Sequence, residues 1–149
     1  MTPEEVLAAI PQQEPFRFID EILDLGDDHI VASYTFSPDA FFYRGHFPGN
    51  PITPGVILIE SMAQAGVVGL GLHMMSCEMG SEEAGKYTTL FTDAQVDFNG
   101  MVDPGTRVIT TGHKVFFRRR KLRSEVEMKR ADDGVLICSG TLSGMGVLR

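Results

Sequence analysis

Two side chains suited to acid–base chemistry, His46 and Glu60, lie close together in the sequence. His46 stands in a loop rich in glycine and proline, and an imidazole that titrates near neutral pH suits a general base. Glu60 is the single acid in the longest apolar segment, where a carboxyl group is costly unless it is paired or used. On Glu60 alone, a structural acid bonded to Gln64 and a catalytic acid with a raised pKa are equally good interpretations. His46, which leads directly into the same segment, favours the catalytic one.

The segment that must position these groups runs from Arg44 to about Met75. Thr53-Pro54 predicts a helix start, because threonine can cap free N–H groups and proline suits the first turn. The predicted helix is apolar on every face, so it must be surrounded by a protein core or by a membrane. Small residues are scattered along it: Ala63, Ala65, Gly66, Gly69 and Gly71.

The polar residues of this helix decide between core and membrane. Its length permits a membrane span, but Glu60, Gln64 and His73 would each be costly in lipid. No second segment of this kind exists, and the flanking chain has the pattern of strands. We therefore expect a buried helix and no membrane. Because Glu60 and Gln64 are four residues apart, they share one helix face, and Gln64 is a candidate partner of the carboxyl.

The remaining chain predicts one α+β domain spanning residues 1–149. Thr2 and Glu5 have the pattern of a capping box for a short helix ending near Ile10. A hairpin is expected from Phe18–Leu25 and His29–Phe36. The four strands expected after the helix are Tyr87–Phe98, Thr106–Phe117, Leu122–Arg130 and Val135–Met145. A single antiparallel sheet curled round one helix would bury that helix completely.

Composition narrows the class of protein. The chain has 149 residues and a formal charge of −7. Its first residues are acidic and contain no apolar run, which predicts no signal peptide. Two cysteines, Cys77 and Cys138, give neither a disulfide framework nor a metal-binding pattern, and this is typical of a cytoplasmic protein. There is no motif for a metal, nucleotide or flavin, so we expect no cofactor.

One stretch, Lys114–Arg130, is basic within this acidic chain. It carries eight cationic side chains, namely Lys114, Arg118, Arg119, Arg120, Lys121, Arg123, Lys129 and Arg130. One interpretation is a solvated hairpin end whose charges discourage pairing of sheet edges. The other is a docking patch for an acidic partner. Nucleic acid is not expected, because the protein as a whole is acidic and has no recognised nucleic-acid motif.

The run GHFPGNPITPGV at residues 45–56, followed by ESMAQ at residues 60–64, closely resembles the signature of the FabZ-type 3-hydroxyacyl-[acyl-carrier-protein] dehydratases. Weaker likeness extends over nearly the whole chain. The resemblance implies the hotdog fold, in which a curved antiparallel sheet of about six strands wraps a long central helix. It also implies a homodimer or a trimer of dimers, with two active sites in each pair of subunits.

The resemblance further implies dehydration of a 3-hydroxyacyl thioester, without a cofactor. His46 would act as the base, while Glu60 would donate a proton to the departing hydroxyl or orient it; the two roles could also be shared differently. The free N–H of Gly55 at the helix start would receive the charge on the thioester oxygen. The motif residues Phe47 and Val56 would contact substrate, and Gln64 would fix the Glu60 carboxyl.

The spacing of these groups bears on the subunit arrangement. Gly55 and Glu60 are roughly 8 Å apart along one helix axis, at ~1.5 Å per residue. That span is awkward within one subunit. Pairing His46 of one chain with Glu60 of the other, as in the family, would ease it.

The implied partner is an acidic acyl carrier protein, which delivers the acyl chain on a phosphopantetheine arm and would dock near Arg118, Arg119, Arg120 and Lys121.

Two stretches depart from the family pattern. Gln12-Gln13-Glu14 stand where the family has His-Arg-Tyr, and residues 97–101 replace a basic stretch. The reaction class is therefore firmer than an assignment to housekeeping fatty-acid synthesis, and a specialised lipid or polyketide pathway stays open. The alternatives are a hotdog acyl-CoA thioesterase and a non-catalytic acyl-carrier-binding subunit.

Overall fold

The central helix forms the core of the computed structural model, which describes the whole chain from Met1 to Arg149. It runs continuously from Gly55 to Met79 as α2 (Gly55–Ala63), a π-helical stretch (Gln64–Gly69) and α3 (Leu70–Met79). By length and composition alone this helix could cross a membrane, but 78% of its most apolar window is buried inside the protein. The predicted buried helix is confirmed.

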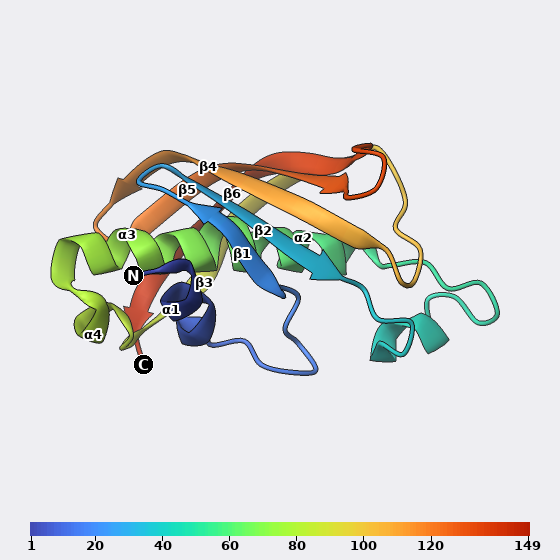
Figure 1. Ribbon diagram of the computed structural model, residues 1–149, viewed down its shortest axis with the longest axis horizontal. Helices are drawn as coiled ribbons and strands as arrows, with labels where there is room; N and C mark the ends of the chain where they lie inside the picture. Colours follow the sequence, from blue (N-terminus) through green and yellow to red (C-terminus); the bar gives the residue numbers. More distant parts are fainter.

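A six-stranded antiparallel sheet curves over this helix (Figure 1). Its strands are β1 (Glu21–Leu25), β2 (His29–Thr35), β3 (Tyr87–Phe98), β4 (Arg107–Arg118), β5 (Lys121–Arg130) and β6 (Leu136–Leu148). Their order across the sheet is β1-β2-β4-β5-β6-β3, so β1 and β3 are the two edges. The predicted α+β hotdog architecture is confirmed, and most strand bounds differ from the expected ones by only one to three residues.

Small residues let the sheet approach the helix closely at the π-helical stretch. A Cβ atom added to Gly112 of β4 would lie 2.8 Å from the Cα atom of Gly66. On β5, the hydroxyl of Ser124 donates a 2.7 Å hydrogen bond to the carbonyl of Gly66. The wider helical turn frees backbone carbonyls from their usual partners, and a strand side chain satisfies one of them.

The N-terminal segment covers one side of the helix. It begins with α1 (Pro3–Ala9), whose capping box of Thr2 and Glu5 is present as predicted. The chain then crosses the central helix near Phe18 before it enters β1. Two short helical turns complete the fold: a 3₁₀ turn (Phe41–Arg44) before the His46 loop and α4 (Ser81–Ala84) before β3.

The start of the central helix differs from the prediction. Thr53 does not cap it, because the Thr53 hydroxyl is hydrogen-bonded to the hydroxyl of Tyr43 at 2.6 Å. Helix α2 begins at Gly55, with Pro54 before it and no side-chain cap. The competing partner is Tyr43, a buried ring of the 3₁₀ turn that the sequence pattern did not connect with Thr53.

Candidate active site

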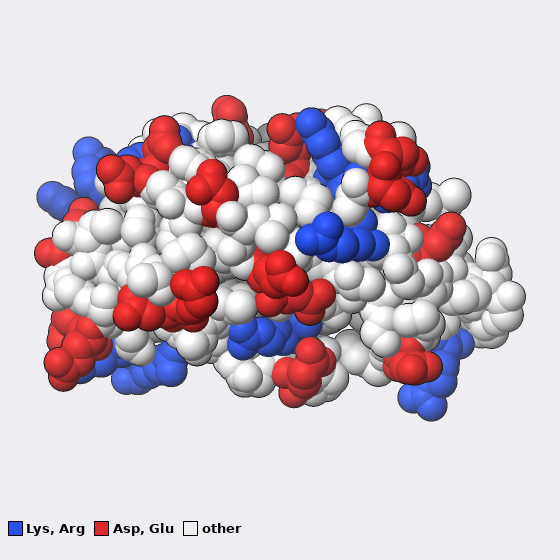
Figure 2. Space-filling view, in the orientation of Figure 1, with Lys and Arg blue, Asp and Glu red and all other residues white.

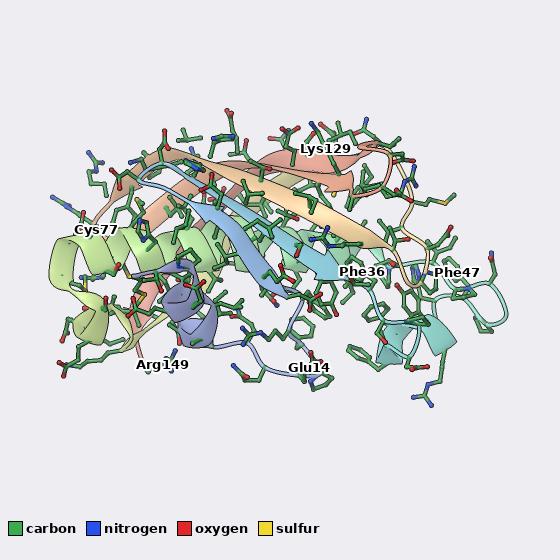
Figure 3. All side chains as sticks on the ribbon, in the orientation of Figure 1. Glu14, Phe36, Phe47, Cys77, Lys129 and Arg149 are labelled. Atoms are coloured by element: carbon green, nitrogen blue, oxygen red, sulfur yellow. The ribbon has the colours of Figure 1, made fainter.

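The loop that carries His46 is closed by backbone hydrogen bonds. The N–H of Ile52 donates to the carbonyl of His46 at 2.9 Å, and Phe47 and Asn50 exchange two bonds of 3.1 and 2.9 Å. Gly49 turns the chain at the tip with a φ of +73°. Figure 3 shows Phe47 at the end of the molecule, beyond the start of α2. The loop therefore holds His46 at the N-terminal end of the central helix.

The ring of His46 is oriented by one hydrogen bond. Its Nδ1 lies 2.8 Å from the carbonyl oxygen of Ile52. A carbonyl oxygen only accepts, so Nδ1 carries the proton and Nε2 of the neutral ring has the free lone pair. The ring of Phe47 stacks on the imidazole, with centroids 4.2 Å apart. His46 is half-buried, and its Nε2 is the atom that can act as a base.

The N–H group of Gly55 has no hydrogen-bond partner within the chain. A capping threonine would occupy the N–H groups of the first turn, but Thr53 is bonded to Tyr43 instead. The free N–H therefore lies at the N-terminal end of the helix, which is the positive end of the helix dipole. A developing negative charge is stabilised there. This is the arrangement needed to polarise a carbonyl group.

A close neighbour leaves little room for a side chain at this position. A Cβ atom on residue 55 would lie 3.1 Å from the ring of Phe98, at the end of β3. Phe98 is itself 49% exposed. The approach to the Gly55 N–H is therefore bounded by the ring of Phe98.

Glu60 is held by the side chain of Gln64, which is fully buried. Gln64 Nε2 donates to Glu60 Oε1 at 3.0 Å and to the carbonyl of Phe16 at 2.9 Å. Gln64 Oε1 accepts the N–H of Phe18 at 2.7 Å. Because both ends of the amide have backbone partners, its orientation is fixed, and it presents an N–H to Glu60. The predicted pairing of Glu60 with Gln64 is confirmed.

The pKa of Glu60 is raised above its ordinary value. Burial of the half-buried carboxyl is the main cause, and the hydrogen bond from Gln64 lowers the pKa in part. Glu60 forms no ion pair. Burial without a cation favours the protonated carboxyl, which is the form that can act as an acid.

A small cavity of about 130 Å³ lies beside Glu60. It is lined by Gln12, Glu60, Ala63, Val67, Val68, Thr89, Leu90 and Phe91. Three of these residues belong to the edge strand β3, so the cavity lies between that edge and the central helix.

A larger hollow of about 380 Å³ lies around His113 and Glu125, strand residues away from every predicted site residue. No group of three or more His, Cys, Asp or Glu side chains is arranged to hold a metal ion.

The structure does not bring His46 and Glu60 together within one chain. No hydrogen bond joins them, and no residue of the His46 loop lines the cavity beside Glu60. Phe47 and Val56, which we expected to contact substrate, are 51% and 73% exposed. Within one chain, His46 and the free N–H of Gly55 therefore lie at the N-terminal end of the central helix, and the Glu60 carboxyl lies apart from His46.

The basic turn lies at the opposite end of the molecule from His46. Arg119 and Arg120, with φ of +51° and +63°, form the turn between β4 and β5. The guanidinium of Arg120 lies over the ring of Tyr87, at the start of β3. Figure 2 shows Lys and Arg side chains at this end with acidic side chains beside them, and further Lys and Arg side chains elsewhere on the same face. The central helix, about 36 Å long at ~1.5 Å per residue, separates the turn from the His46 loop.

The sequence did not assign a role to two residues of the site. Gln12, which lines the cavity beside Glu60, was noted only as a departure from a family pattern. Phe98 lies against Gly55 although 43 residues separate them, and nothing local predicts that contact. The one available signal was the glycine at the helix start, which indicates that a neighbour lies close.

Comparison with known proteins agrees with this architecture. The model of the FabA-like domain matches residues 10–143. The 3-hydroxyacyl-[acyl-carrier-protein] dehydratase FabZ of Streptococcus pyogenes serotype M5 (strain Manfredo) is 35% identical over 144 residues, covering 96% of each protein. The protein of the same name from serotype M3 (strain ATCC BAA-595 / MGAS315) is 36% identical over 146 residues, again covering 96% of each.

Solved structures share the fold at lower identity. The dehydratase heterocomplex ApeI:P from Xenorhabdus doucetiae contains a chain that matches with a TM-score of 0.77 at 16% identity, covering 100% of this chain and 93% of that one. A mutant form of a thioesterase from Pseudomonas aeruginosa matches with a TM-score of 0.67 at 16% identity, covering 100% and 97%. A family model over most of the chain, together with relatives more than a third identical over nearly its full length, shows that the chain belongs to the FabA-like family, among its FabZ-type 3-hydroxyacyl-[acyl-carrier-protein] dehydratases.

Proposed function

We propose that the protein dehydrates 3-hydroxyacyl thioesters carried by an acyl carrier protein to trans-2-enoyl thioesters, in fatty-acid or related acyl-chain biosynthesis. The observation that carries the proposal is the half-buried Glu60, which is fixed by Gln64 and has no cation beside it. A carboxyl group kept protonated in this way can assist the departure of a hydroxyl group. The family membership of the chain supports the same reaction.

The reaction needs one proton removed and one delivered. Nε2 of His46 takes the proton from C2 of the substrate, while the Gly55 N–H stabilises the charge that develops on the thioester oxygen. The electron pair forms the C2=C3 double bond as the C3–O bond breaks. Glu60 gives its proton to the leaving hydroxyl, and water departs. Return of the His46 proton to Glu60, directly or through water, restores the starting state.

The active site is completed by a second copy of this chain. Six consecutive residues of the edge strand β3, from Leu90 to Gln95, are exposed, and an exposed, partly apolar edge strand is a surface for strand pairing. Thr89, Leu90 and Phe91 also line the cavity beside Glu60. A partner strand paired with β3 would therefore lie next to Glu60, so that the His46 loop of the partner can reach it. A closed twofold dimer has two such sites.

Sedimentation tests this assembly. The protein should be a homodimer or a trimer of dimers, and Ala94→Lys, which places a charge in the middle of the exposed edge, should shift it toward monomers. The substitution Asp27→Lys, in the exposed turn of the β1–β2 hairpin, is the matched control and should leave the mass unchanged. A wild-type protein that is monomeric at the concentration of the activity assay would contradict the shared site.

An acidic carrier protein would dock on the basic turn. Arg118, Arg119 and Lys121 form no ion pair, so their charges are free to meet a partner. Reversing the charge of Arg119 and Lys121 should raise the KM for the carrier-linked substrate and leave the KM for a pantetheine-linked one unchanged. Arg44→Glu, beside the His46 loop, is the comparison. If Arg44→Glu alone raises the KM, the carrier docks at the loop end instead.

The proposed location is the cytoplasm. Both cysteines are free, with Cys77 exposed and Cys138 buried, which is typical of proteins from reducing compartments.

The decisive test of the reaction is to incubate the purified protein with 3-hydroxyacyl thioesters of different acyl length, on carrier protein and on coenzyme A. An enoyl thioester is the expected product. Release of a free thiol would identify a thioesterase, and binding without turnover would identify a non-catalytic subunit.

A further inference from the structure

Gln12 presents a buried acceptor without a donor. Its Oε1 atom is buried and has no hydrogen-bond partner, and it is one of only two such side-chain atoms in the protein. A buried amide oxygen left unpaired costs free energy, so native structures rarely keep one without a reason. Gln12 is also one of the residues that line the small cavity beside Glu60.

The same cavity contains a donor once Glu60 is protonated. Glu60 Oε1 already accepts a hydrogen bond from Gln64, so the acidic proton resides on the other oxygen, Oε2. Every other residue that lines the cavity, apart from Thr89, is apolar: Ala63, Val67, Val68, Leu90 and Phe91. A carboxyl O–H in this small space has few acceptors, and the oxygen of Gln12 is an unused one.

We propose that Gln12 is a positioning residue for Glu60: its buried amide oxygen accepts a hydrogen bond from the protonated Glu60 carboxyl. Gln64 then donates to one carboxyl oxygen while Gln12 accepts from the other. The two glutamines hold the carboxyl as an acid from opposite sides, and the proton stays available at a fixed oxygen. This inference rests on the proposed function only for its catalytic consequence, because a hydrogen bond between Gln12 and protonated Glu60 does not require substrate.

Few other groups lie close enough to Glu60 to shift its pKa. From the helix, Gln64 is the one group that bonds Glu60, and no ionised residue of the N-terminal segment or of β3 lines the cavity. The remaining titratable group is His46 of the partner subunit, which the proposed dimer would bring to the same site. Its charge is removed by working in a His46→Ala background.

The direct test is a titration of Glu60. In protein with the glutamate side-chain carboxyl labelled with ¹³C, the resonance lost in Glu60→Gln identifies Glu60. In the His46→Ala background, Gln12→Met has a side chain of similar length but no amide acceptor. A hydrogen bond to the neutral form raises a pKa, so Gln12→Met should lower the pKa of Glu60 by about one unit. Gln13→Met is the matched control, because the side chain of Gln13 bonds the carbonyl of Ile10 and does not line the cavity.

A second variant, Gln12→Glu, distinguishes a loss of the hydrogen bond from a folding defect in Gln12→Met. Gln12→Glu places two carboxyl groups in one cavity, where they share a proton, so the pKa of Glu60 should rise. A purely structural role for residue 12 would not move the pKa in opposite directions in the two variants. An unchanged or higher pKa in Gln12→Met, with its unfolding midpoint preserved, would overturn the proposal.

The catalytic readout is separate. With His46 restored, Gln12→Met should move the alkaline limb of the kcat profile to lower pH by about one unit, with KM little changed. If the protein does not dehydrate the thioester at all, the proposed function fails, whereas the titration of Glu60 still decides the role of Gln12.

Discussion

Gln64 donates a 3.0 Å hydrogen bond to Glu60 one helical turn before it, and it accepts a 2.7 Å bond from the backbone of Phe18 with its other end. The amide cannot turn over without breaking both bonds. One oxygen of the Glu60 carboxyl is thereby committed as an acceptor, and the other is left to carry a proton. The segment before β1 thus fixes, through Gln64, the orientation of the Glu60 carboxyl.

Replacing Glu60 by glutamine should abolish most of the activity without unfolding the protein. Glutamine keeps an oxygen that accepts from Gln64, but it has no proton to give. We expect the rate of enoyl formation to fall by about 10²–10⁴-fold, the usual contribution of a positioned acid. Glu78→Gln, an exposed acid on the same helix, is the control and should retain wild-type rates. Equal turnover by both variants would remove Glu60 from the site.

The raised pKa of Glu60 also predicts how stability depends on pH. The unfolded chain releases this proton near the ordinary pKa of 4.5, while the folded protein holds it to higher pH. The folded state therefore binds more protons in that window, and its free energy of unfolding falls as pH rises through it.

Glu60→Gln lacks this titration. Measured by denaturant unfolding, the free energy of unfolding of Glu60→Gln relative to wild type should increase from about pH 4 to about pH 8. A constant difference between the two proteins across that range would mean that the carboxyl is not held in its protonated form.

Gln64→Leu should be strongly destabilising. The substitution leaves three groups without their partner: the N–H of Phe18, the carbonyl of Phe16 and the carboxyl of Glu60. Because a buried unpaired group costs about 1–3 kcal/mol, a loss of about 2–5 kcal/mol in the free energy of unfolding is expected. Gln13→Leu, which removes only the hydrogen bond to the carbonyl of Ile10, should lower it by no more than about 1 kcal/mol. A loss no larger than that of the control would show that the network is dispensable.

The role of the Gly55 N–H can be tested by removing it. Gly55 is the first residue of α2, where proline is tolerated, and Pro54 before it already has the extended backbone that precedes a proline. Gly55→Ala adds a Cβ atom near Phe98 but keeps the N–H, so it is the matched control. Gly55→Pro should lower kcat about 10²–10³-fold below Gly55→Ala. Equal rates in the two variants would exclude the N–H from the reaction.

Much of the fold could be predicted from the sequence, because local patterns specify it. The Thr2–Glu5 capping box, the helix apolar on every face and the turns between strands each depend on neighbouring residues. The start of α2 could not be predicted, since Tyr43 competes for the Thr53 hydroxyl. The π-helical stretch could not be predicted either, because Gly112 and Ser124, which contact the helix there, belong to strands distant in the sequence.

The site was predictable in its parts and not in its assembly. His46 and Glu60 were identifiable by residue type, and the four-residue spacing correctly predicted the bond between Glu60 and Gln64. The contacts of Gln12 and Phe98 with the site depend on tertiary packing, which no local pattern encodes. In the proposed dimer, His46 would meet Glu60 only across the subunit interface, and a single chain does not specify that interface.

Mixed dimers test the central claim most directly. His46→Ala and Glu60→Gln are each inactive if both residues act in the reaction. Unfolding the two variants together and refolding them gives dimers of which about half contain one subunit of each kind. If each site takes His46 from one subunit and Glu60 from the other, every mixed dimer has one intact site, and activity should recover to about a quarter of wild type. If both residues act within one subunit, no site is intact, and a mixture that stays inactive although mixed dimers form would contradict the account.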